Sequence, residues 1–146
     1  RITMKTRPVV LLQLLLWGIC AFHIMVGIGL NVSTDFLSVM AGYYGADTKT
    51  WSPDFVYIVK PLGAFMIAMG VLAAQAATRQ FEHRLTVYAF VLLFVMRAIQ
   101  RFVFREDLTE LFAISPVRNS GNMIFFLALA IALFVLYHYA GRSRAK

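Results

Sequence analysis

The chain has 146 residues, of which 60% are hydrophobic and only 14% are charged, and its formal net charge is +7. A soluble domain of this length, in which charged residues usually make up about 25%, has no means of burying so much apolar surface. The composition therefore predicts an integral membrane protein with a single transmembrane domain, residues 1–146. The basic residues flank the hydrophobic runs, where they suit anionic lipid headgroups, and this placement argues against nucleic acid as a partner.

The first hydrophobic run extends from Pro8 to about Leu30. The basic stretch before it resembles the start of a signal peptide. However, the run exceeds the roughly 7–15 residues of a signal-peptide core, and no small-residue cleavage site follows it. We therefore expect a retained first membrane helix, since about 20 apolar residues cross the hydrocarbon core. The single cysteine, Cys20, excludes an intrachain disulfide and a two-cysteine redox site.

The connection after this run, Asn31–Ser52, is long and contains aromatic residues. Its Ser33-Thr34-Asp35 segment has the composition of a helix N-cap and precedes apolar residues. Tyr43, Tyr44 and Trp51 are of the type that gathers at membrane interfaces. We expect a short interfacial helix in this first outer loop.

Three further runs have the length of membrane helices: about residues 53–77, 85–104 and 116–140. Ser52-Pro53 and Ser115-Pro116 each place a capping hydroxyl before a proline at the first helical position. No run alternates polar and apolar residues with a period of two, so a membrane barrel is not expected. The predicted fold class is all-α, an integral membrane four-helix bundle with spans at about 8–30, 53–77, 85–104 and 116–140.

The distribution of lysine and arginine predicts the orientation of this bundle. Eight of them lie on the side of the chain ends: Arg1, Lys5, Arg7, Arg79, Arg84, Arg142, Arg144 and Lys146. Three lie in the loops of the other side: Lys49, Arg105 and Arg118. Both termini are therefore expected to be cytoplasmic, in a multi-pass protein of the bacterial inner membrane.

Small residues are most frequent in the second predicted span. The pairs Ala64/Ala68 and Gly70/Ala74 have the spacing that lets membrane helices approach closely. The third span is bulkier. We expect the second helix to be central and the third to present a wide face to lipid or to a partner.

Polar residues at membrane depth are the main functional signal, because a charged group there costs about 2.5–3.5 kcal/mol. All four spans contribute such residues to one layer in their outer part: His23, Lys60, Arg97, Arg101 and Asn122. In one interpretation, the cations reach lipid phosphates and acidic loop residues and so anchor the bundle. In the other, the layer lines a binding pocket for an anionic or carbonyl-bearing group, such as a lipid headgroup, a quinone or an acidic substrate.

His23 is also a candidate ligand for a haem or chlorophyll-type metal, with Gly27 one turn away leaving space for a flat ring. The alternative is a histidine that only packs in the bundle. His138 lies near the opposite end of its span, so the two cannot hold one iron. No metal-ligand cluster, phosphate-binding glycine loop or serine–histidine arrangement occurs in the sequence. The sequence therefore requires no cofactor, and we predict no metal site and no catalytic residue.

The layout resembles small bacterial four-helix membrane proteins of the DoxX-like families. The likeness rests on Lys60-Pro61-Leu62-Gly63-Ala64-Phe65, on Arg97 and on Ser115-Pro116-Val117-Arg118-Asn119. This resemblance implies a four-helix membrane fold and a subunit role, since some members act as subunits of membrane oxidoreductases. It carries no catalytic residue over to this chain.

Two functional hypotheses follow. The first is a non-catalytic accessory subunit of a larger membrane complex, for example an energy-converting one, with lipids and other membrane subunits as partners. The second is a small membrane binder or carrier of a lipid, quinone or hydrophobic metabolite that uses the polar layer. An enzyme would depend on the same polar residues.

Overall fold

A computed structural model describes residues 7–47 and 51–144, and these residues form helices joined by short connections. Four helices are long and apolar enough to cross a membrane: α1 (Arg7–Val32), α3 (Pro53–Thr78), α4 (Arg84–Val103) and α6 (Pro116–Arg144). Two shorter helices lie between them, α2 (Thr34–Tyr43) and α5 (Arg105–Phe112). The all-α prediction with four membrane-length helices is confirmed, as is a short helix in the first long connection.

Side-chain caps explain where several helices begin. The Ser33 hydroxyl accepts a hydrogen bond of 3.2 Å from the backbone N–H of Phe36 at the start of α2. Ser52 caps α3 in the same way at 3.2 Å, and Ser115 caps α6 at 3.3 Å. Each satisfies an N–H group that the first helical turn leaves without a carbonyl partner. The sequence predicts no helix in the second connection, where the structure has α5.

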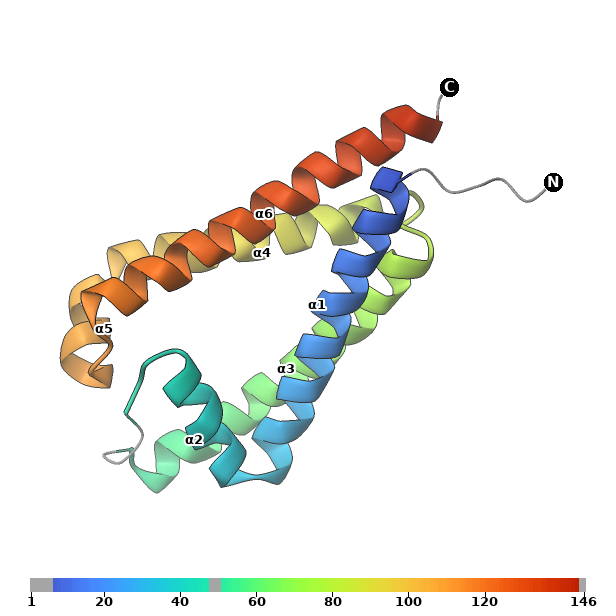
Figure 1. The fold of residues 1–146 in the computed structure, drawn as a ribbon. Helices are drawn as coiled ribbons and strands as arrows, with labels where there is room; N and C mark the ends of the chain where they lie inside the picture. Colours follow the sequence, from blue (N-terminus) through green and yellow to red (C-terminus); the bar gives the residue numbers. More distant parts are fainter. Residues whose placement is uncertain (1–6, 48–50, 145–146) are drawn as a thin grey trace.

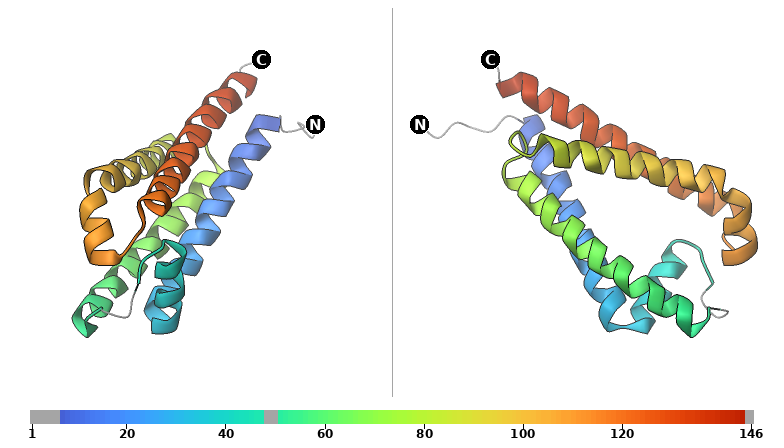
Figure 2. Two further views of the ribbon diagram at one scale, coloured as in Figure 1. Left: turned by 60° about the vertical axis from the view of Figure 1, so that its left-hand side comes forward. Right: turned by 180° about the vertical axis from the view of Figure 1, so that it is seen from behind.

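The four long helices form two antiparallel pairs, α1 with α3 and α4 with α6 (Figure 1). The pairs meet at the end that holds the start of α1, the end of α6 and the α3–α4 turn, which we call the closed end (Figure 1). They diverge toward the other end, the open end, where α2 and α5 lie (Figure 2). The bundle is therefore V-shaped, with its widest space between the pairs near α2 and α5.

The closed end contains most of the core. Leu12 and Leu16 of α1, Val87 and Phe90 of α4, and Leu133 of α6 are completely buried there. Small residues of α3, including Ala73 and Ala76, belong to the same cluster. This packing joins the two helix pairs where they meet.

The expectation that α3 is central is wrong. α1 packs against α3 along its length and also against α6 and α2, whereas α3 packs mainly on α1. Of the small residues expected at the interface, Gly70 is buried, but Ala64 and Ala68 are exposed. Depth in the membrane follows from sequence position, but the buried face of a helix does not, because lipid and protein interior are both apolar.

Glycines bring α1 and α3 together. A Cβ added to Gly27 would lie 2.6 Å from the carbonyl oxygen of Gly63 and 2.7 Å from a side-chain carbon of Ile67. A Cβ on Gly70 would lie 2.6 Å from the side chain of Ile24. The space beside Gly27 is thus filled by α3, and the expectation that this glycine makes room for a flat ring beside His23 is wrong.

Candidate functional site

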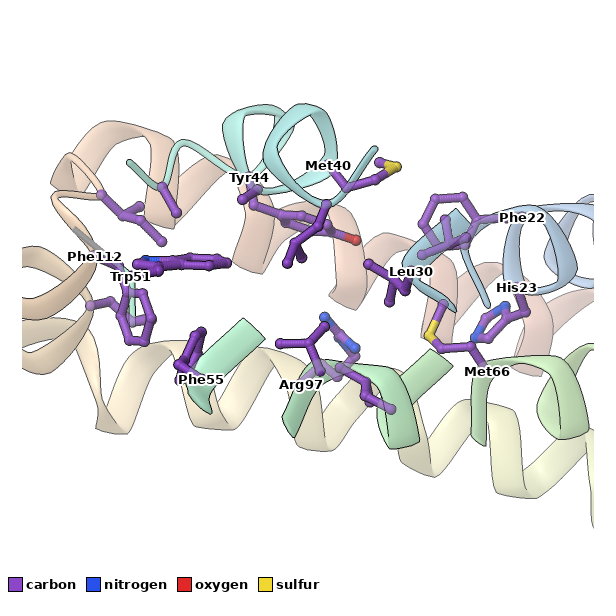
Figure 3. A pocket seen from close by; sticks show the side chains of 18 of the residues that line it. Phe22, His23, Leu30, Met40, Tyr44, Trp51, Phe55, Met66, Arg97 and Phe112 are labelled. Carbon is purple, nitrogen blue, oxygen red and sulfur yellow. The ribbon is translucent and has the colours of Figure 1, made fainter. Parts of the chain in front are cut away.

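A cavity of about 290 Å³ lies between the two helix pairs in the open half of the V, with residues of all six helices in its wall. Figure 3 shows side chains converging on this space from α1, α2, α3, α4 and α5. The lining is mainly aliphatic and aromatic, with Leu30, Leu37 and Met66 among its members. Clefts between helices of a bundle are a common location for small-molecule sites.

Three aromatic rings form the wall nearest the open end. The centroid of the Trp51 ring lies 4.9 Å from that of Phe55 and 6.1 Å from that of Phe112, and the last two are 6.1 Å apart. Trp51 and Phe55 are at the start of α3, and Phe112 ends α5, so these contacts connect the two arms of the V. The indole nitrogen of Trp51 is buried and has no hydrogen-bond partner among the described residues.

Arg97 is the one charged side chain in the lining of this cavity within residues 7–47 and 51–144. Its guanidinium points into the space (Figure 3), and its Cζ lies 4.7 Å from the centroid of the Phe126 ring. The ion pairs found in the described part of the chain join Arg79 to Glu82 and Arg105 to Glu106, and both are exposed. Arg97 therefore has an aromatic neighbour but no carboxylate partner within the residues that the structure places.

His23 lies at the end of the cavity nearer the closed end and is only 6% exposed. Its Nδ1 is 2.8 Å from the carbonyl oxygen of Ile19, so this nitrogen carries the proton and donates. The rings of Phe22 and Phe90 stand at its edges, with centroids 5.7 and 5.8 Å away. These contacts hold the imidazole in one orientation as part of the cavity wall.

Arg101 and Asn122 belong to the frame beside the cavity. The Arg101 guanidinium donates to Asn119 Oδ1 at 2.9 Å, and Asn119 Nδ2 donates back to the Arg101 carbonyl at 2.9 Å. Asn122 donates to the Tyr44 carbonyl at 3.3 Å. These bonds join α4 to α6 and α6 to the end of α2.

The predicted polar layer therefore separates into three groups. His23 and Arg97 line the cavity, while Arg101 and Asn122 hold helices together next to it. Lys60 is exposed on α3 and lies outside the lining. These residues lie at similar levels along their own helices, but their side chains do not all face the space between the helix pairs.

The sequence prediction missed the aromatic part of the site. Tyr44 at the end of α2, Trp51 before α3 and Phe112 of α5 all line the cavity. Sequence reasoning places Tyr44 and Trp51 in an interfacial belt, where their amphipathic rings would face headgroups. One sequence feature is consistent with their inward position. Both connections at the open end contain aromatic residues, and these rings contact each other between the two helix pairs.

The volume of the cavity limits what it holds. A cavity of about 150 Å³ lined by aliphatic and aromatic side chains accommodates one benzene molecule. The space here is about twice as large. Among the described residues, no three histidine, cysteine or acidic side chains are grouped to hold a metal ion.

Comparisons with known proteins give no match of the chain to a family model, to a curated protein or to a solved structure. The resemblance to DoxX-like proteins is thus neither supported nor contradicted, and the function has to be argued from the site itself.

Proposed function

We propose that this protein is a small membrane-embedded binder or carrier of a hydrophobic molecule that bears an anionic or carbonyl group. The observation that carries the proposal is Arg97, whose guanidinium points into an apolar cavity without a carboxylate partner among the described residues. The molecule would lie between the two helix pairs, with its polar group on Arg97.

The energetics of burial support this assignment. Arg97 is half-buried, and a charge that is partly removed from water is costly unless it is paired or hydrogen-bonded; the cation–π contact with Phe126 compensates only part of that cost. Arg101, one turn further along α4, shows the usual solution, since Asn119 accepts from it. Arg97 has no comparable acceptor among the residues described, so a ligand group with oxygen acceptors would complete its environment.

The position of the cavity favours a ligand that arrives from the bilayer. The cavity is only partly enclosed, and two side chains of its lining, Phe22 of α1 and Leu62 of α3, are exposed. Both belong to helices that are long and apolar enough to span a membrane. A hydrophobic molecule dissolved in lipid would therefore reach the cavity without crossing water.

The accessory-subunit hypothesis stays a prediction. Its main structural argument is the apolar outer surface of α4, which includes the exposed side chains Leu85, Leu92 and Ile99. Lipid suits such a surface as well as a protein partner does. The cavity is a feature that lipid contact alone does not explain, and it is why we favour the binding role.

We further propose that the closed end faces the cytoplasm of a bacterial cell and that the open end faces outward. The excess of lysine and arginine near the chain ends and the α3–α4 turn supports this orientation. In it, α2 is an interfacial helix. Its exposed Val39 and Tyr43 suit the boundary between headgroups and acyl chains.

The test is whether the protein retains a small molecule when it is purified gently in native lipid. Native mass spectrometry should show a bound mass in the wild-type protein, and that mass should be lost in Arg97→Gln. Arg105→Gln is the matched control, because Arg105 is eight residues further along the chain and outside the lining of this cavity. A wild-type protein that carries no bound molecule, and binds none when hydrophobic acids, esters or quinones are supplied, would refute the proposal.

A further inference from the structure

The polar groups of the cavity restrict the chemistry of its ligand further than the proposed function does. We propose that the ligand is a single-chain amphiphile with a terminal carboxylate, and that the carboxylate lies between the Arg97 guanidinium and the Tyr44 hydroxyl. This inference rests on the proposed function and names the ligand class for the same site.

The first argument is the arrangement of hydrogen-bond donors. Figure 3 shows the Tyr44 hydroxyl and the Arg97 guanidinium pointing into the cavity from α2 and α4, on opposite sides of it. A guanidinium only donates, and a phenol has one proton to donate. A group that only accepts hydrogen bonds, such as a carboxylate, matches both donors.

The second argument is charge. The described residues of the lining include no aspartate or glutamate, so the positive charge of Arg97 is not neutralised within the wall. A neutral ketone, ester or quinone carbonyl would accept a hydrogen bond but would leave that charge uncompensated in an apolar space. A carboxylate supplies both the acceptor and the opposite charge, and its two oxygens match the planar fork of a guanidinium.

The third argument is size. A cavity of about 290 Å³ is about twice the volume that holds benzene, so it takes roughly twelve carbon-sized atoms. This volume suits one chain of about that length. The chain would run from Arg97 toward Phe22 and Leu62, two exposed side chains of the lining, and a longer tail would leave the cavity past them.

The two tryptophans of the chain provide an internal reporter and its control. Trp51 lines the cavity, whereas Trp17 is 46% exposed on α1 and lies outside the lining. In lipid nanodiscs, the variant Trp17→Phe leaves Trp51 to report occupancy of the cavity. The variant Trp51→Phe leaves Trp17 to report ligand that has merely dissolved in the bilayer.

The probes are 2-bromododecanoate and its neutral methyl ester, since bromine quenches nearby indole fluorescence. We expect the acid to quench Trp51 saturably and the ester to quench both tryptophans only in proportion to its concentration in lipid. Arg97→Gln should weaken binding of the acid by about tenfold or more, Arg97→Lys by less, and Arg105→Gln not at all. Tyr44→Phe should weaken it by a few-fold. Arg97→Lys keeps the charge, so it keeps the test valid if Arg97→Gln fails to fold.

The results that contradict the inference can be distinguished from those that contradict the proposed function. Equal saturable quenching by the acid and the ester, unchanged in Arg97→Gln, would overturn the carboxylate and leave a binding protein for neutral molecules. Displacement by dodecyl phosphate at lower concentration than by dodecanoate would replace the carboxylate with a phosphate. No saturable quenching in a protein that still carries a native bound molecule would overturn the inference alone. No quenching and no bound molecule would overturn both.

Discussion

Arg97 and Arg101 lie one turn apart on α4 and have different roles. Arg101 exchanges two hydrogen bonds with Asn119, which is buried against it, and so contributes to the contact between α4 and α6. Arg97 points into the cavity and lies over the face of the Phe126 ring on α6. The difference arises because α6 offers an amide opposite one arginine and a phenyl ring opposite the other.

Removing the Arg101 contact should destabilise the protein without emptying the cavity. Arg101→Leu removes the donor to Asn119 Oδ1 but keeps the backbone carbonyl to which Asn119 Nδ2 donates, and a hydrogen bond between membrane helices contributes about 0.6–2 kcal/mol. We expect a lower thermal unfolding temperature in detergent and normal ligand content once the protein is folded. Arg105→Leu is the control, because the ion pair that Arg105 forms among the described residues is an exposed contact with Glu106. An unfolding temperature that falls equally in both variants would contradict this role.

For single residues, the sequence predicts the position of a polar side chain along its helix but not the direction in which that side chain points. His23, Lys60 and Arg97 are correctly recognised as polar groups within membrane-length helices. Only two of them face the cavity, and Lys60 faces outward. In a soluble helix the polar face marks the solvent side, but a membrane helix is apolar on both the lipid side and the protein side. The residue pattern therefore does not report which way a side chain points.

At the scale of elements, the contact between α1 and α3 depends on glycine. Gly27 of α1 faces Gly63 and Ile67 of α3, so the two backbones approach more closely than any side chain would allow. Gly18 lies on the same helix, but a Cβ added there meets nothing within 4 Å. The two glycines form a matched pair in which only one is at a tight interface.

Gly27→Ala should destabilise the protein, whereas Gly18→Ala should leave its stability unchanged or slightly higher. The added methyl at Gly27 would lie 2.6 Å from a backbone oxygen, which has no rotamer to relieve the clash. Overpacking of this kind costs about 1–3 kcal/mol, while alanine at an open helix position is favoured over glycine by up to about 1 kcal/mol. Thermal unfolding of both variants in one detergent measures the difference. Equal stability would show that α1 and α3 are not in close contact.

At the open end, the two helix pairs are connected by short elements, mainly α2, α5 and the connections beside them. Asn122 donates to the carbonyl of Tyr44, Arg118 donates to the carbonyl of Tyr43, and the N–H of Asp47 donates to Phe112 at 3.2 Å. Together with the rings of Trp51 and Phe112, these bonds connect the end of α2 and the start of α3 to α5 and α6. The end of the cavity is thus closed by a few contacts across the V and not by a packed core.

Phe112→Ala should therefore speed the release of a bound ligand. The substitution removes one ring of the aromatic wall and opens the cavity toward the end of the molecule where α2 and α5 lie. Leu111→Ala is the control on the same helix, because Leu111 is 68% exposed and outside the lining. Stopped-flow recovery of Trp51 fluorescence after dilution of the brominated acid measures the release rate. A rate that changes equally in both variants would mean that the aromatic wall does not retain the ligand.

At the scale of the whole molecule, the sequence predicts the four long helices to within a few residues, because their length and caps are local properties. It does not predict the V. That shape depends on which face of each helix is buried, on α1 rather than α3 being central, and on α5, whose apolar residues are too few to identify it as a helix. The cavity could not be foreseen for the same reason, since it exists only where the two pairs diverge.

The orientation of the protein in the membrane is testable, because each end of the V has a residue that can be replaced by cysteine and labelled. In a Cys20→Ser background, His83→Cys labels the α3–α4 turn at the closed end, and Glu106→Cys labels exposed α5 at the open end. The basic residues near the chain ends predict that the closed end is cytoplasmic. A membrane-impermeant maleimide added to intact cells should therefore label Glu106→Cys at once and His83→Cys only after permeabilisation. The reverse pattern would place the aromatic wall at the cytoplasmic surface, and a ligand would then load from inside the cell.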